Sequence, residues 1–94
     1  MLYVNEILFD EWNEEHIAHH HVAPEEVEEV CLGNPFVSKT REGRLRVIGQ
    51  TEAGRYLTII LVPRGRGLYY PVSARDATDA ERRLYIHQKR KGER

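Results

Sequence analysis

The sequence contains one cysteine, no Lys or Arg in its first 38 residues, and no long apolar run. The single thiol, Cys31, cannot form an internal disulfide, and its place between Val30 and Leu32 in an apolar pattern predicts a small core residue rather than a nucleophile. The longest apolar stretch, residues 57–62, is far shorter than the ~18 residues of a membrane span, and no basic segment precedes an apolar one at the N-terminus. We therefore expect a cytoplasmic protein that has no membrane contact.

Charge is divided unevenly along the chain. Residues 1–38 carry nine carboxylates and no cation, a formal charge of −9, whereas residues 39–94 carry fourteen Lys and Arg against six carboxylates, which gives +8. This division predicts that the second part recognises an anionic partner, or that one partner contacts both signs. The length of 94 residues suits one modest core. We expect a single domain over residues 1–94, with a basic flexible tail from about residue 89.

The N-terminal part predicts a short strand followed by two helices. Residues 3–9 have strand-like character, and Asp10 is a good helix N-cap because carboxylates occupy the turns that follow it. We expect this helix to run to about His20. Pro24 suits the first position of a second helix, which the Gly33-Asn34-Pro35 segment should end.

From residue 36 the apolar pattern changes to a period of two, which is typical of strands. Pro71 predicts an edge or a bulge in the last strand, and Thr78 and Glu81 have the spacing of a capping box that opens a C-terminal helix. The order predicts an α+β domain with a mainly antiparallel sheet of about four to five strands, two N-terminal helices and a C-terminal helix. The strands expected in this second part are residues 36–41, 44–47, 56–62 and 68–74, with 56–62 in the centre of the sheet.

A histidine cluster ends the first predicted helix. His16 and His20 lie at i and i+4, the spacing of two metal ligands on one helix face, but His87 is the only other histidine outside the cluster, so we favour no metal site. Three other roles stay open for these side chains: a cation at the helix C-terminus, a half-buried hydrogen-bonding residue, or a general acid or base near neutral pH.

Arginines follow the predicted strands. Arg44 and Arg46 share one strand face, Arg55 begins the central strand beside Tyr56, and Arg75 ends the last strand. In an antiparallel sheet several of these guanidinium groups can converge on one face with nearby tyrosines, a mixture that binds phosphate through planar forks and bases through stacking. Exposed arginines that serve only solubility are the alternative reading.

Taken together, the segments resemble the BrnT family of small toxins, which share the RelE-like fold of bacterial toxin–antitoxin ribonucleases. The resemblance runs from about Phe9 to Tyr85, and it depends on the order and spacing of its pieces rather than on any one of them. The pieces are Phe9-Asp10, His16-Ile17-Ala18 with His20, Pro24-Glu25-Glu26-Val27-Glu28-Glu29-Val30, Ile48-Gly49-Gln50-Thr51, Gly54-Arg55-Tyr56-Leu57, Ser73-Ala74-Arg75-Asp76-Ala77-Thr78, and Glu81-Arg82 with Tyr85.

The resemblance implies a metal-independent endoribonuclease that cleaves RNA, inhibits translation and growth, and needs no cofactor. Its partners would be the RNA substrate and a cognate ribbon-helix-helix antitoxin of the BrnA type, through which it would form an oligomer. It assigns catalysis to His20, Arg75, Arg82 and Tyr85. With the arginine pattern it assigns RNA binding to Arg44, Arg46, Gln50, Arg55 and Tyr56.

Three positions depart from the family pattern. Gln50 stands where many members have Arg, Asn13 where many have Lys, and His21 replaces a glycine at a position where a left-handed backbone is plausible. A non-catalytic member of the same fold, acting as a protein-interaction or RNA-binding module, is therefore the alternative function. A ligand-binding or metal-dependent enzyme built on the histidines is a third, weaker reading.

Overall fold

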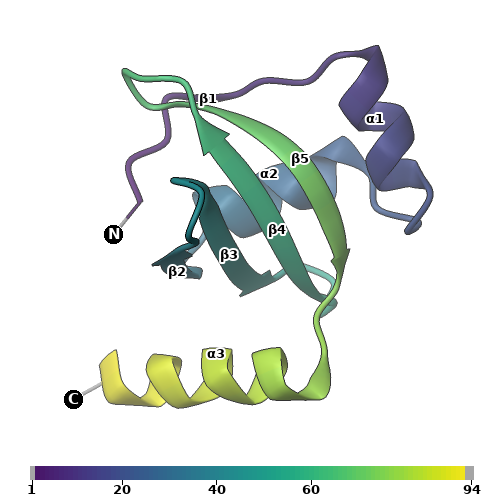
Figure 1. Cartoon of the computed structure of the whole chain (residues 1–94). Coiled ribbons are helices and arrows are strands. Elements are labelled where there is room, and N and C mark those ends of the chain that lie inside the picture. Colours follow the sequence, from purple (N-terminus) through teal and green to yellow (C-terminus); the bar gives the residue numbers. More distant parts are fainter. Residues whose placement is uncertain (1, 93–94) are drawn as a thin grey trace.

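Five strands form one mixed sheet in the order β1-β5-β4-β3-β2 (Figure 1). The computed structural model describes residues 2–92. Neighbouring strands are antiparallel except β1, which pairs in parallel with β5, and the predicted α+β class and central strand are confirmed. The strands are β1 (Glu6–Ile7), β2 (Phe36–Lys39), β3 (Leu45–Gln50), β4 (Tyr56–Pro63) and β5 (Leu68–Asp76).

The three helices are α1 (Glu11–Ala18), α2 (Pro24–Leu32) and α3 (Asp79–Gly92). Asp10 caps α1 as predicted: its Oδ1 accepts from the Asn13 backbone N–H at 2.9 Å, and the Asn13 Oδ1 accepts from the Asp10 backbone N–H. α1 ends at Ala18, two residues before the predicted end, because residues 19–21 form a turn in which His21 adopts φ 58°. The left-handed backbone expected at His21 is therefore present.

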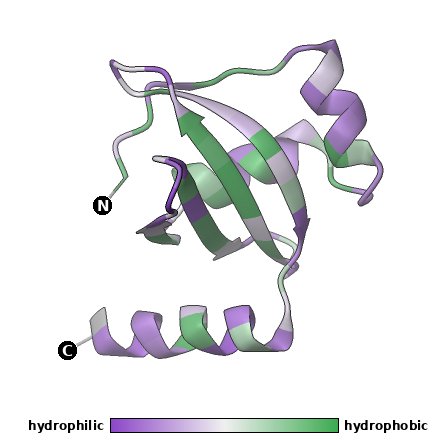
Figure 2. Cartoon of the chain, viewed as in Figure 1, coloured by the Kyte–Doolittle hydropathy of each residue, from purple (hydrophilic) through white to green (hydrophobic). Residues whose placement is uncertain are grey.

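The sheet has two different faces. Its back face carries Leu57, Ile59 and Leu61 of β4, which are fully buried against apolar side chains of α1 and α2. In Figure 2 most of β4 has the green of hydrophobic residues. Burying these side chains supplies the main stabilisation of the fold. The alternate residues of β4, which include Thr58 and Ile60, point to the opposite, front face, where α3 packs against β2 and β3.

The last strand contains a bulge next to Pro71, as the sequence predicts. The β4–β5 register shifts between Ile60 and Leu61, whose partners are Ser73 and Pro71, so Val72 is the extra residue of a bulge.

α3 includes residues 89–92 of the predicted tail, whose flexibility stays a prediction, and residues 93–94 lie outside the described part. Within residues 2–92, no helix is long and apolar enough to cross a membrane.

Candidate active site

Four of the predicted site residues meet at one end of the front face, where β4 begins, β5 ends and α3 starts. Tyr56 is the first residue of β4, Arg75 is the second-last of β5, and Arg82 and Tyr85 lie on the first turns of α3. Antiparallel pairing brings the start of β4 beside the end of β5, with Thr58 opposite Arg75. The short connection to α3 then places that helix over the same end of the sheet (Figure 1).

Arg75 is held by a carboxylate that the sequence reading did not assign to it. Asp76 or Asp79 are the partners one would choose from sequence proximity at this helix entry, but the Arg75 side chain pairs with Glu81: Nη1 lies 2.8 Å from Oε1 and Nη2 3.0 Å from Oε2. Its Nη1 also donates to the Asp76 carbonyl oxygen. Thirty-nine per cent of the Arg75 side chain remains exposed, so it can still meet an external ligand while its fork is fixed.

Glu81 is the centre of this arrangement. Its Oε1 also accepts from the Thr58 hydroxyl at 2.9 Å and from the Thr78 backbone N–H at 2.9 Å, which confirms the predicted capping box. The hydrogen bonds from Arg75, followed by those from Thr78 and Thr58, outweigh desolvation and lower the pKa of Glu81 to about 2. Glu81 therefore stays ionised and supports Arg75 at any pH near neutrality.

Arg82 lies over an aromatic pair. Its guanidinium carbon is 4.4 Å from the centre of the Tyr56 ring, and Tyr56 meets Tyr85 edge to face at 5.9 Å. Arg82 is exposed, whereas Tyr85 is 7% exposed, and the ammonium group of Lys89 lies 5.8 Å from the Tyr85 ring centre. Arg82 is thus a cation that solvent and ligands can reach, and the buried Tyr85 supports the Tyr56 ring on which Arg82 lies.

Gln50 lies beside this group, because it is the register partner of Tyr56 at the end of β3. Its side chain is exposed, and its Nε2 donates to the Gly54 carbonyl oxygen at 3.0 Å, which braces the turn between β3 and β4. Gln50 therefore has a structural role in that turn and remains accessible at the edge of the site.

The Arg55 side chain makes several hydrogen bonds within the protein that the sequence did not predict. Its Nε donates to Asp76 at 2.8 Å, its Nη1 donates to Glu26 and to the His21 carbonyl oxygen, and its Nη2 donates to the His20 carbonyl oxygen at 3.1 Å. The hydrogen bonds to Asp76 and then to Glu26 raise the pKa of Arg55 despite partial desolvation. This side chain ties the α1–α2 loop to α2 and β5, and little of it is left to bind RNA.

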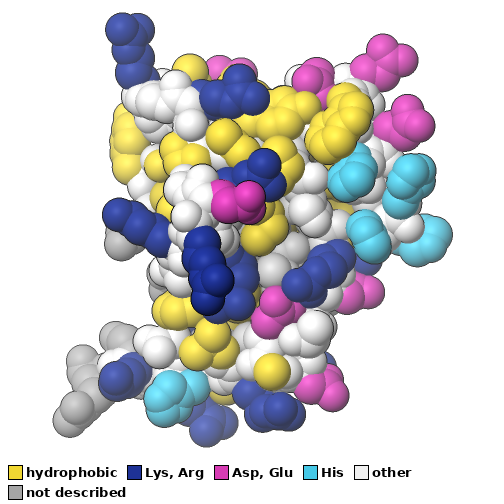
Figure 3. Space-filling view, viewed as in Figure 1, with side chains coloured by type: hydrophobic (Ala, Val, Ile, Leu, Met, Phe, Trp, Pro, Cys, Tyr) yellow, Lys and Arg dark blue, Asp and Glu magenta, His cyan; other side chains and the backbone are white. Residues whose placement is uncertain are grey.

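His20 lies in the loop that Arg55 holds, not on α1 as predicted, and its side chain is exposed. The Arg55 side chain points to the back of the sheet, as Leu57 does two residues later. His20 therefore lies on the side of the sheet opposite Arg82. A chain of hydrogen bonds joins His20 to Arg75. The His20 carbonyl oxygen accepts from Arg55, Arg55 donates to the Asp76 side chain, and the Asp76 carbonyl oxygen accepts from Arg75. Figure 3 shows most of the histidine side chains along the right side of this view, apart from most Lys and Arg, and another near the bottom.

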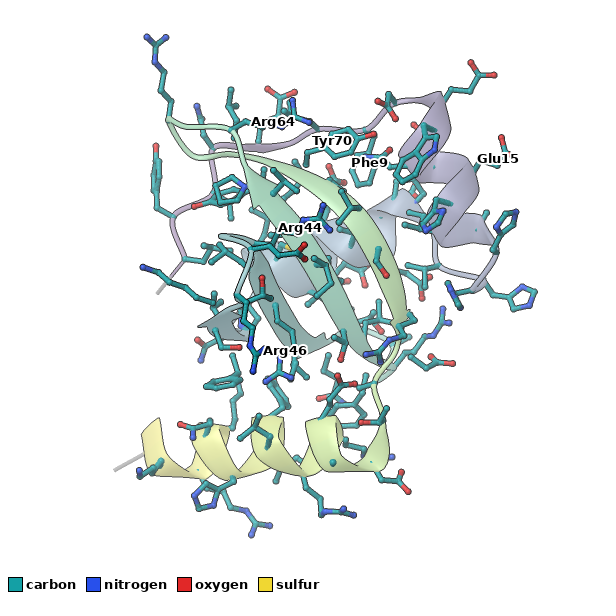
Figure 4. The ribbon with its side chains drawn as sticks, viewed as in Figure 1. Phe9, Glu15, Arg44, Arg46, Arg64 and Tyr70 are labelled. Atoms are coloured by element: carbon teal, nitrogen blue, oxygen red, sulfur yellow. The ribbon has the colours of Figure 1, made fainter. Side chains whose placement is uncertain are left out.

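Arg44 and Arg46 lie farther along the front face, at the start of β3 (Figure 4). Arg46 is four residues from Gln50, which is about 13 Å along a strand, so these two arginines form a second basic area distinct from the group around Arg82. The Nε of Arg46 is buried and has no hydrogen-bond partner among the described residues.

The other histidines of the cluster and Asn13 lie on or next to α1. His16 stacks on Trp12, with ring centres 4.7 Å apart, and these two residues line a shallow pocket with Glu15 and His19. Within residues 2–92, no three His, Cys, Asp or Glu side chains are grouped so as to hold a metal ion. Asn13 is fully buried, donates to the Leu8 carbonyl oxygen and helps to cap α1 with Asp10.

A protein-family model matches most of the chain. The family model described as "Ribonuclease toxin, BrnT, of type II toxin-antitoxin system" matches residues 9–81, which is more than three quarters of the chain. No curated protein and no solved structure matches this chain.

Proposed function

Because the chain belongs to the BrnT family of ribonuclease toxins of type II toxin–antitoxin systems, we propose that it is an active, metal-independent endoribonuclease of the cytoplasm. We propose further that it inhibits translation and growth by cutting RNA, and that a ribbon-helix-helix antitoxin of the BrnA type neutralises it. The family supplies the class of activity. The roles proposed for individual residues combine the resemblance with their positions in the fold.

The reaction uses the substrate's own nucleophile. The ribose 2′-oxygen loses its proton to a base and attacks the adjacent phosphorus, the bond from phosphorus to the 5′-oxygen breaks, and an acid gives a proton to that leaving oxygen. The products are a 2′,3′-cyclic phosphate and a 5′-hydroxyl. We assign one of the two proton transfers to His20, which Arg55 holds at the back of this end of the sheet, so the RNA would have to pass round the end of β5 to meet both His20 and the front-face arginines.

Phosphate binding is assigned to the two arginines at this end. Arg75 offers the exposed part of a guanidinium that Glu81 has already oriented, and Arg82 offers a charge with no ion-pair partner among the described residues. Both act on the negative charge that develops on the phosphoryl oxygens, where donors that need no rearrangement are most effective. Tyr85 keeps Tyr56 and Arg82 in position, and Tyr56 and Gln50 contact the neighbouring nucleotide.

One observation carries the proposal: residues far apart in the sequence, Tyr56, Arg75 and Arg82, meet at one end of the front face with a cation left exposed. The test is expression of the chain alone in a bacterial host. Growth arrest with cleaved RNA, and rescue by the antitoxin encoded beside it, are the expected results. Normal growth and intact RNA at a verified level of folded protein would contradict the proposal.

A non-catalytic interaction module is the second candidate, and two contacts favour it. Arg75 is neutralised by Glu81, and Arg55 is occupied by four protein partners. A protein of this kind would bind its antitoxin and RNA without cutting the RNA. Binding of an RNA oligonucleotide by the purified protein, with no product after prolonged incubation, would distinguish this function from the first.

A further inference from the structure

The front face of the sheet is only partly covered by the described residues. α3 packs against β2 and β3 and reaches β4 at Tyr56 and Thr58, whereas α1 and α2 lie on the back. Farther along β4, Ile60 and Val62 point forward and are only half-buried, and Tyr70 of β5 pairs with Val62. Figure 1 shows this part of the sheet facing the viewer with no helix in front of it. A strip of apolar side chains is therefore left at an accessible surface.

Arg46 borders this strip, and one of its hydrogen-bond donors is unpaired within the described part of the chain. It is the register partner of Ile60, its Nε is buried, and that atom has no hydrogen-bond partner among the described residues. Buried side-chain donors are nearly always paired in folded proteins. Arg44, two residues earlier on the same face, adds a second, exposed cation (Figure 4). Neither arginine takes part in an ion pair among residues 2–92.

These features together define the chemistry of a ligand. It must bring an anionic acceptor to the half-buried Arg46, at the terminal nitrogens of the guanidinium because its Nε is itself buried, and aliphatic groups to Ile60 and Val62. RNA supplies the acceptor, but its bases stack on aromatic rings. The ring in the strip, Tyr70, already lies under Arg64, and its hydroxyl donates to Asp10. The pair Tyr56 and Tyr85 is at the other end of the face. A peptide that carries both a carboxylate and apolar side chains supplies both parts.

We infer that this strip, with Arg46 and Arg44 at its edge, is the docking surface for an acidic, apolar segment of the antitoxin, which places one carboxylate on the Arg46 guanidinium. The inference rests on the proposed neutralisation by an antitoxin. It also gives that neutralisation a mechanism, because Ile60 and Ser73 are two residues, or about 7 Å, from Thr58 and Arg75. A segment seated on the strip would lie across the approach of RNA to the arginines.

The test compares the affinities of variants for the purified antitoxin encoded beside the gene, measured by calorimetry. Arg46→Met keeps the aliphatic stem and removes the charge, and Val62→Asn makes the strip polar. We expect each to weaken antitoxin binding at least about tenfold. Arg66→Met removes an exposed charge in the β4–β5 turn and is the matched control, with unchanged affinity expected. Unchanged affinity in both Arg46→Met and Val62→Asn, with both variants folded, would overturn the inference.

A second measurement separates the two classes of macromolecule. The Nε–Hε resonance of Arg46 is followed by NMR while the antitoxin, or a 2′-O-methyl RNA oligonucleotide that cannot be cleaved, is added. We expect the antitoxin to shift this resonance, and a resonance that responds to RNA but not to the antitoxin would assign the surface to RNA and overturn the inference. Neither readout requires cleavage, so failure of the proposed ribonuclease activity would be recognised separately in the RNA assay.

Discussion

Arg75 and Glu81 form a two-pronged ion pair across the junction of β5 and α3, with nitrogen–oxygen distances of 2.8 and 3.0 Å. The same carboxylate closes the capping box of α3 and accepts from Thr58 in the sheet. One side chain thus fixes the start of the helix, the end of the strand and the orientation of the proposed phosphate-binding arginine. The geometry of the site therefore depends on the charge of a largely buried carboxylate.

Replacing Glu81 by Gln should destabilise the fold in a pH-dependent way. Because the folded-state pKa is lowered from 4.5 to about 2, the stabilisation is fully present above about pH 4.5 and is lost as the pH falls towards 2. We expect Glu81→Gln to lower the free energy of unfolding by about 1–3 kcal/mol near neutral pH. Urea titrations at several pH values measure it, with the exposed Glu28→Gln as control. A loss that stayed constant down to the lowest pH would contradict this account.

Replacing Arg55 should loosen the loop that carries His20. Lys keeps the charge but cannot reproduce the fork that reaches Asp76, Glu26 and the two loop carbonyl oxygens, so Arg55→Lys should cost about 1–3 kcal/mol of stability and reduce RNA cleavage. Arg41→Lys, in the exposed turn before β3, is the matched control. If Arg55 instead served RNA binding alone, the variant would keep wild-type stability, which urea unfolding would reveal.

Adjacent arginines on α3 offer a sharp comparison for RNA binding. Arg82 lies over Tyr56, whereas Arg83 is exposed with no ion-pair partner among the described residues. Arg82→Gln should weaken binding of a short RNA about tenfold, and Arg83→Gln should have a much smaller effect. Fluorescence anisotropy at several salt concentrations measures both, and the affinity of the wild-type protein should fall steeply with salt. Equal effects of the two variants would mean that only net charge matters.

Local signals in the sequence predicted the boundaries of the helices well. Asp10, the Gly33-Asn34-Pro35 segment and the Thr78–Glu81 box each act within a few residues of themselves, and the structure contains the cap, the stop and the box. β1 is shorter than predicted, two residues instead of seven, because only Glu6 and Ile7 pair with β5.

The site was harder to predict because its contacts join distant residues. The carbonyl oxygens of His20 and His21 lie 35 and 34 positions from Arg55 in the chain, and no spacing rule connects them. The hydrogen-bonding role of Arg55 and the fork between Arg75 and Glu81 depend on how the strands pair. The assignment of His20, Arg75, Arg82 and Tyr85 to catalysis stays a prediction.

The buried thiol should be chemically inert. Cys31 is 2% exposed, and desolvation, with a smaller contribution from Glu28, raises its pKa to about 12. Since the thiolate is the reactive form, iodoacetamide at about pH 8 should leave Cys31 unmodified in the folded protein and alkylate it in urea. Mass spectrometry measures the modification. Rapid labelling of the native protein would show that the core of α2 opens readily.

The central claim, that this chain cuts RNA with its own side chains, is tested most directly by the ends of the fragments. Purified protein is incubated with RNA in the presence of EDTA, and the products are analysed by mass spectrometry beside those of His20→Ala and Arg75→Ala. The account predicts 2′,3′-cyclic phosphate and 5′-hydroxyl ends for the wild type, and at least about a hundredfold slower cleavage for both variants, each still folded. Intact RNA, or cleavage at an undiminished rate by both variants, would contradict it.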